Sequence, residues 1–312
     1  TEIYTLSLHD ALPIFRSPAS PTCRYHTAAV SGNADSDADR TVFQGGKLGL
    51  RASVLITALL LIWLCPAQAV PRNHCLDCHP AHYTEQGSCR YCHRGNPQTN
   101  RKELAHGGLI KGQYAGFSNS RSAELTAGKR LAEQTACRRC HTLAASGNRL
   151  ASNLDNLLWT TKPELIRRAL VEPAQQMPDF HFSAPDLDRL ITAILAGGLQ
   201  AGKAAKEPPQ VVFFSNVDTQ KQHIFVKQCG GCHKLLSKRD GGLGRGIDGP
   251  NLSGLLTRFY PPDFEGNKPW NEERLKRWLQ NPREIRSQTM MRPVVLTPPE
   301  WQELLKTITT SD

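Results

Sequence analysis

The chain has 312 residues, which allows two or three domains, and only 39% of them are hydrophobic. With 24 glycines and 21 prolines, the composition predicts short helices, many loops and little apolar material for a core. One clearly apolar run, residues 52–64, is too short to span a bilayer, so we expect no transmembrane span in the mature chain. The net charge of +10 would suit a negatively charged partner.

One pattern, two cysteines separated by two residues and followed by histidine, occurs four times. This pattern is the attachment signature of c-type haem: two thiols one helical turn apart form thioethers to the porphyrin, and the histidine binds the iron. Four copies predict four covalently bound haem c groups. The attachment residues are Cys75, Cys78, Cys89, Cys92, Cys137, Cys140, Cys229 and Cys232, and the proximal iron ligands are His79, His93, His141 and His233.

The cysteines have two other interpretations. A single pair could be a thioredoxin-like redox site, and the first two pairs together could be a four-cysteine zinc site. Neither explains the histidine after every second cysteine. The four motifs use eight of the ten cysteines and leave Cys23 and Cys65. Each haem also brings two propionates, which offset the positive charge, so we expect no nucleic-acid partner.

The amino-terminal region is expected to contribute nothing to the fold. Residues 1–46 are interpreted as non-native or disordered, since residues 1–15 resemble a translated sequencing adapter. Residues 47–69 combine a basic flank, a short apolar core and an Ala-x-Ala site, the three parts of a signal peptide cleaved near Ala69. Lipidation at Cys65 is a weaker alternative, because Trp63 and Leu64 are bulky. Export to the periplasm or beyond fits haem attachment outside the cytoplasm.

Residues 70–117 hold the first two motifs and show no strong helical periodicity. We expect this dihaem segment to be small, irregular and held together by its metal centres. The region has no methionine, so the distal iron ligands are predicted to be His82 and His106, giving two bis-histidine haems. His74 is the third candidate.

Residues 118–202 show the pattern of a helical domain. The spacing predicts a helix over 123–135 before the third motif, a second helix opened by a capping box at Thr161–Glu164, and a last helix capped by Ser183 and ended by Gly197 and Gly198. Met177 lies in the loop between the second and last helices. This order resembles the small monohaem cytochrome c fold, in which a loop methionine approaches the iron opposite the histidine. The resemblance implies His141 as the proximal and Met177 as the distal ligand.

Residues 211–312, after a linker at 203–210, repeat the middle domain. Residues 164–173 match residues 273–282, and Thr297 caps the final helix as Ser183 does. The offset that relates these caps carries Met177 onto Met291, so Met291 is preferred to Met290 as the distal ligand. The loop Gly249–Leu252 resembles the family loop whose proline carbonyl accepts the proximal histidine ring N–H. The equivalent Ser152–Leu154 lacks this proline, which leaves the partner of His141 open.

The predicted fold is therefore mainly α, with two cytochrome c-like domains after the dihaem segment. Closed coordination at all four irons predicts an electron carrier rather than an enzyme, with bis-histidine haems feeding methionine-histidine haems and redox proteins as partners. One alternative is a peroxidase- or reductase-type haem enzyme with one open iron. A shortage of distal ligands would favour it, but His74, His181, His223 and Met290 are spare candidates. Another is a conducting module of a membrane-associated cytochrome complex. Donor, acceptor, direction of flow and oligomeric state stay open.

Overall fold

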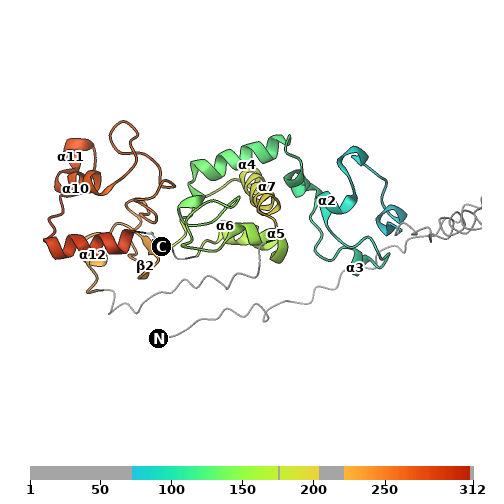
Figure 1. Ribbon diagram of the computed structural model, residues 1–312, viewed down its shortest axis with the longest axis horizontal. Helices are drawn as coiled ribbons and strands as arrows, with labels where there is room; N and C mark the ends of the chain where they lie inside the picture. Colours follow the sequence, from blue (N-terminus) through green and yellow to red (C-terminus); the bar gives the residue numbers. More distant parts are fainter. Residues whose placement is uncertain (1–71, 175, 204–220, 310–312) are drawn as a thin grey trace, which may run out of the picture. The chain divides into compact units, whose positions relative to one another are not determined.

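The computed structural model describes residues 72–174, 176–203 and 221–309, and within them the chain is mainly helical, as expected (Figure 1). These residues form two units, one of residues 72–82 and 97–105, and a larger one of residues 83–96 and 106–309. The region 1–46 interpreted as non-native or disordered, which contains Cys23, and the expected signal peptide at 47–69, which contains Cys65, lie outside the described residues, as does most of the expected linker at 203–210.

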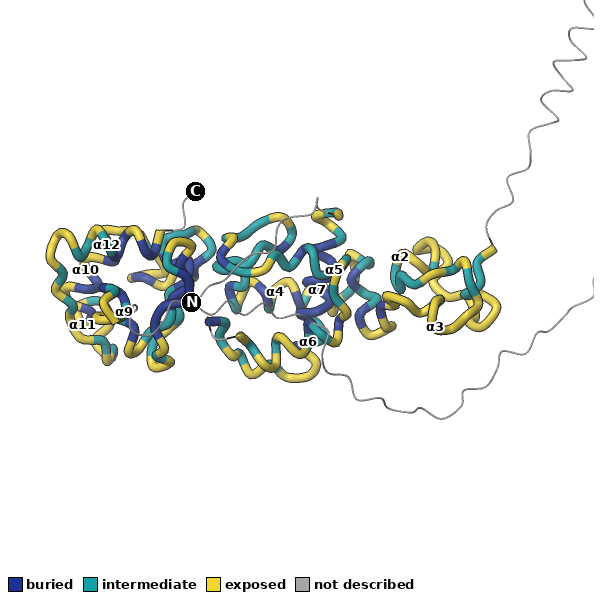
Figure 2. The backbone as a smooth tube through the Cα atoms, turned by 90° about the horizontal axis from the view of Figure 1, so that it is seen from below, coloured by how far each residue is buried: buried dark blue, intermediate teal, exposed yellow. Residues whose placement is uncertain are grey.

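The dihaem segment has short helical turns and no buried residue from 72 to 109, and Figure 2 shows the tube around α2 and α3 exposed or half-buried. This region therefore has no apolar core of its own among the described side chains. The smaller unit contains η1 (His74–Asp77) and α3 (Lys102–Ala105). The larger unit begins with η2 (Thr84–Gln86), α2 (Cys89–His93) and η3 (Gly112–Ser118).

The middle domain has the predicted helix order. Ser122 accepts a hydrogen bond from the Leu125 N–H at the start of its first helix, and Ser183 caps its last helix through the Asp186 N–H. Both caps satisfy backbone donors that have no partner within the helix. The elements are α4 (Ala123–Gln134), η4 (Cys137–Arg139), η5 (Leu154–Asn156), α5 (Leu157–Thr160), α6 (Pro163–Val171) and α7 (Ala184–Ala201).

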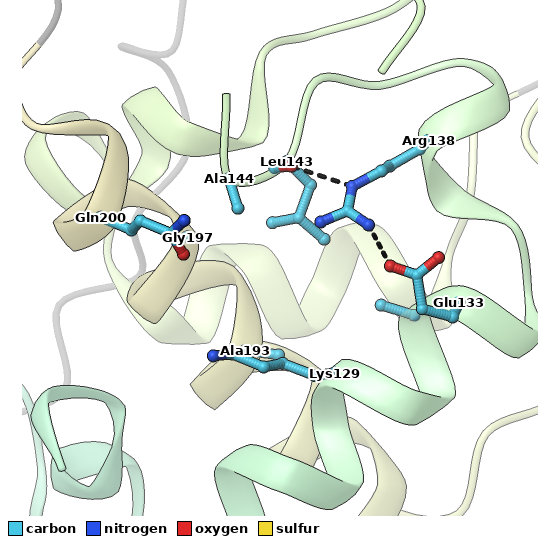
Figure 3. Close-up of a pocket in the computed structure, with 9 residues that line it drawn as sticks. Lys129, Glu133, Arg138, Leu143, Ala144, Ala193, Gly197 and Gln200 are labelled. Atoms are coloured by element: carbon cyan, nitrogen blue, oxygen red, sulfur yellow. Dashed lines mark hydrogen bonds and ion pairs between the residues drawn. The ribbon is translucent and has the colours of Figure 1, made fainter. Parts of the chain in front are cut away.

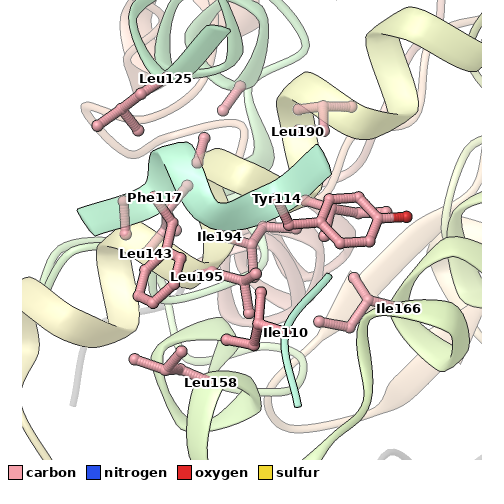
Figure 4. Close-up of a cluster of buried hydrophobic side chains, with 14 residues drawn as sticks. Ile110, Tyr114, Phe117, Leu125, Leu143, Leu158, Ile166, Leu190, Ile194 and Leu195 are labelled. Carbon is pink, nitrogen blue, oxygen red and sulfur yellow. The ribbon is translucent and has the colours of Figure 1, made fainter. Parts of the chain in front are cut away.

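The core of the middle domain forms around α7 and includes side chains from before residue 118. Ile110, Tyr114 and Phe117 are buried in the same cluster as Leu190, Ile194 and Leu195 of α7 (Figure 4). α4 crosses α7 closely at Gly128, where a Cβ atom would collide with the backbone oxygen of Arg189. Packing of the middle domain thus extends across the expected boundary at residues 117 and 118.

Two local expectations for the middle domain were wrong. The capping box at Thr161 does not form: α6 begins at Pro163, whose fixed φ suits a first helical position, and Lys162 is the N-cap. Its Glu164 carboxylate instead pairs with Lys111 Nζ at 2.7 Å.

α7 also does not end at Gly197 and Gly198 but continues to Ala201. A Cβ atom on Gly198 would lie 2.5 Å from the backbone oxygen of Asp155 and 2.8 Å from Leu158 Cβ. These glycines therefore allow close packing against the loop after the third motif rather than ending the helix.

The last domain repeats the helical plan and adds a hairpin. The hairpin pairs β1 (Leu235–Ser237) with β2 (Gly241–Leu243) antiparallel, Leu235 opposite Leu243. Thr297 caps the final helix as expected, and together with Glu300 it forms a capping box. The helices are α9 (Ile224–Gln228), α10 (Glu272–Gln280), α11 (Pro282–Ile285) and α12 (Pro298–Ile308), and the core includes Phe225, Leu243, Phe264, Leu275, Leu304 and Ile308.

Replacing Gly198 separates the two roles of this glycine. If Gly198 only weakened the helix, Gly198→Ala would stabilise the protein by about 1 kcal/mol. Because the added methyl group meets backbone, we expect a loss of about 1–3 kcal/mol in thermal or denaturant unfolding. Gly112→Ala is the matched control, since a Cβ there meets nothing within 4 Å. A raised melting temperature for Gly198→Ala would contradict the packing role.

Candidate haem-binding sites

Each attachment motif is a tight helical turn. The backbone N–H of the motif histidine donates to the carbonyl of the first cysteine at 3.0 Å in the first and third motifs and 2.9 Å in the fourth. The second motif is the helix α2 itself. One turn brings residues three and four apart to the same side, so each motif can present both thiols and the imidazole together.

Three of the motif histidines hold their Nδ1 atoms against backbone carbonyls. The acceptors are Ile110 O for His93 at 3.0 Å, Ser152 O for His141 at 2.8 Å and Pro250 O for His233 at 2.8 Å. A carbonyl can only accept, so Nδ1 carries the proton and Nε2 keeps its lone pair. Burial also lowers the pKa of His141, which favours the neutral ring that iron binds.

The missing proline of the middle domain therefore has no structural consequence for this contact. Ser152 supplies the same backbone carbonyl as Pro250, and a carbonyl is present in any residue. In the last domain Gly249 adds a second constraint, because a Cβ there would lie 2.6 Å from His233 Nδ1. Gly249 thus leaves room for the His233 ring against the loop.

Three thiols of the last two motifs lie in surroundings that disfavour the thiolate form. Burial raises the pKa of Cys137 and Cys140, and raises that of Cys229 to about 11. Redox-active and zinc-bound cysteines need a lowered thiol pKa. No group of three or more potential ligands lies together in the described ranges, and the motif cysteines there form no disulfides. The raised pKa values of Cys137, Cys140 and Cys229 argue against a thioredoxin-like pair in the last two motifs.

The predicted distal histidines, His82 and His106, both lie at the exposed surface. His74, the third candidate, contacts Asp77 through Nδ1 at 2.8 Å, and this contact and Arg72 lower the pKa of Asp77. That His82 and His106 are the distal ligands stays a prediction, and which of them serves which iron stays open.

Met177 and Met291, the two predicted distal methionines, are both half-buried. Met291 packs against the core of the last domain, and its Sδ accepts a hydrogen bond from Trp278 Nε1 at 2.9 Å. Met290 is 86% exposed. The choice of Met291 over Met290, made on sequence offset, is therefore supported by burial and remains a prediction as an iron ligand.

The spare histidines have other surroundings. His181 is exposed and contacts Asp179 at 3.2 Å. His223 caps α9 by accepting from the Phe225 N–H, and its Nε2 lies 3.2 Å from Thr307 Oγ1 of α12. His223 therefore connects the first and last helices of its domain, a contact that sequence spacing could not reveal.

Two pockets lie near the motifs. A pocket of about 180 Å³ between α4 and α7 is bordered by Arg138, which bonds Leu143 O and Glu133 (Figure 3). It is smaller than the ~300–1,000 Å³ typical of ligand sites. A second pocket of about 700 Å³ lies beside the second motif, between Tyr91 and Trp159, but none of the haem-attaching side chains lines it. Neither is assigned as a haem site.

Comparison with known families gives a match within the middle domain. The family model described as cytochrome C oxidase, cbb3-type, subunit III matches residues 123–192. The match runs from the start of α4 into α7 and contains the third motif and Met177. No curated protein and no solved structure matches the chain. The family match supports a c-type cytochrome domain at 123–192, a kind of domain that carries covalent haem and exchanges electrons with redox partners.

Gly249 offers a test of the fourth site. Gly249→Ala should displace the His233 ring, so in the haem-loaded protein we expect high-spin absorbance from about one haem in four. Gly231→Ala, inside the same motif, meets nothing within 4 Å and is the control. An unchanged low-spin spectrum in Gly249→Ala would show that the ring does not need this space.

Proposed function

We propose that this chain is an exported tetrahaem c-type cytochrome that carries electrons between redox proteins. The observation that carries the proposal is the shared support of His93, His141 and His233, each with Nδ1 at a backbone carbonyl. This arrangement prepares Nε2 for iron and recurs in three sites that share little surrounding sequence. The family match over 123–192 adds independent support for one of the four sites.

In this proposal protein side chains occupy both axial positions of every iron. His82 and His106 complete the first two sites, and Met177 and Met291 complete the last two. When bound, haem supplies a one-electron couple, and fixed ligands on both sides allow oxidation and reduction with little rearrangement. Electron transfer rather than catalysis at an open iron follows from this arrangement.

The ligand set also orders the sites energetically. Thioether sulfur favours ferrous iron more than imidazole does, so the sites of Met177 and Met291 lie at higher potential than the two bis-histidine sites. Electrons are then expected to enter at the dihaem segment and move toward the two carboxy-terminal domains.

Location and partners follow from the leader segment and from this chemistry. The signal peptide at 47–69, cleaved near Ala69, would direct the chain to the periplasm or beyond, where haem is attached. In the ranges that the structure describes, no helix is both long and apolar enough to cross a membrane. Partners are redox proteins, met in solution or in a membrane-associated complex.

The first test is haem stoichiometry and carbon monoxide binding on the purified holoprotein. We expect four covalent haems per chain and a reduced spectrum that carbon monoxide leaves unchanged, because no iron has an open position. Fewer than four haems would contradict the tetrahaem assignment. A shift in part of the haem absorbance would contradict closed coordination and point to an open, catalytic iron.

The second test distinguishes the neighbouring methionines. Met291→His should lower one midpoint potential by a sizeable part of the ~0.8 V range that axial ligands span, and leave the other three nearly unchanged. Met290→His, at the 86% exposed neighbour, should change none. Potentiometric titration of both variants decides the assignment, and a shift confined to Met290→His would reverse it.

A further inference from the structure

Two loops of the larger unit meet, and each lies next to residues proposed to hold iron. One is the loop of Gln176 and Met177 from the middle domain. The other is the loop 249–254 of the last domain, whose Pro250 carbonyl accepts from His233 Nδ1. The Asn251 side-chain Nδ2 donates to the backbone oxygen of Gln176 at 2.8 Å. Asn251, the residue after Pro250, is thus in contact with Gln176, the residue before Met177.

The Asn251 carboxamide is held in one orientation. Its Oδ1 accepts from the Ser253 N–H at 3.0 Å and from Ser253 Oγ at 2.6 Å. A flipped amide would place Oδ1 against the Gln176 carbonyl and Nδ2 against an N–H, so both ends would be repelled. The donor of Asn251 is therefore directed at the residue before Met177.

The Gln176 side chain is enclosed at this junction. Only 9% of Gln176 is exposed, and its Nε2 lies 3.4 Å from Gly244 O of the last domain. The backbone of the Met177 turn is closed on its other side by the Met177 N–H, which donates to Ala174 O at 2.8 Å. A buried carbonyl depends on its hydrogen-bond partner, because no water replaces a lost donor.

Further contacts fix the two loops beside each other. Arg139, inside the third motif, donates from Nη1 to Asn251 O at 3.0 Å, and Asn148 Nδ2 donates to Thr257 Oγ1 at 3.0 Å. Gly254, at φ +72°, leaves no room for a Cβ, which would lie 2.7 Å from Arg139 O. The two loops are therefore in contact through their backbones as well as through their side chains.

We propose that Asn251 of the last domain is a positioning residue for Met177 of the middle domain. Its amide donor holds the Gln176 carbonyl and so presents the Met177 turn to the iron of the third site. The same short loop supports His233 through Pro250, which links the ligand spheres of the third and fourth sites. This inference rests on the proposed function, since it takes Met177 as an iron ligand.

The test uses the ferric holoprotein and the methionine-to-iron charge-transfer band at the red end of the visible spectrum. Asn251→Asp keeps an acceptor for Ser253 but replaces the donor to Gln176 O with a carboxylate oxygen. We expect it to lose the part of this band that belongs to the third site. In a Met291→His background the remaining band reports Met177 alone, and there we expect Asn251→Asp to abolish it.

Asn148→Asp is the matched control, because it makes the same chemical change at the same junction without contacting the Met177 turn. The control should keep the band. Full band intensity in Asn251→Asp, or equal loss in both variants, would overturn the positioning role.

Two further measurements distinguish loss of Met177 positioning from damage to the last domain and from a wrong ligand assignment. In the single Asn251→Asp variant, the Met291 band reports whether the last domain is intact; loss of that band while the Met177 band persists would overturn the proposal. If the Met291→His variant with Asn251 unchanged shows no such band, Met177 is not an iron ligand. The proposed ligand set would then fail together with the positioning role.

Discussion

The structure depends on a hydrogen bond between an imidazole Nδ1 and a backbone carbonyl. Iron binding needs a neutral ring that is presented through Nε2, and a carbonyl acceptor fixes both the proton and the ring plane. His93, His141 and His233 find this acceptor at Ile110, Ser152 and Pro250, which lie 17, 11 and 17 residues downstream. Each site is therefore closed by a short loop, at a small cost in chain entropy.

The buried apolar side chains form two separate clusters. One cluster surrounds α7 and another surrounds α12, while the residues from 72 to 109 bury no side chain. The second motif is instead attached to the middle domain by its neighbours. Ile110 and Tyr114 enter the α7 cluster, and the Arg94 guanidinium lies 4.0 Å from the centre of the Trp159 ring. A cation over an aromatic face adds attraction where little apolar surface is available.

Hydrogen bonds also connect the loops of the proposed third and fourth sites. The loop that supports His233 also holds the turn before Met177, and Arg139 contacts that loop from within the third motif. A change of geometry in one site would therefore reach the other through two or three hydrogen bonds.

Residue types and their spacing were enough to predict haem attachment and the order of the helices. Apolar periodicity, with Ser183 and Thr297 as caps, predicted the last helix of each carboxy-terminal domain correctly, whereas the Ser122 cap was found only in the structure. Tertiary structure alone decided which carbonyls support the histidines, because every residue offers a carbonyl and no side chain marks it. Gly198 and Asn251 illustrate the same limit: a glycine that looked like a helix end is a packing contact, and an asparagine's donor has meaning only once Gln176 lies beside it. Residue types and their spacing predict local chemistry, whereas contacts between distant parts of the backbone exist only in the folded chain.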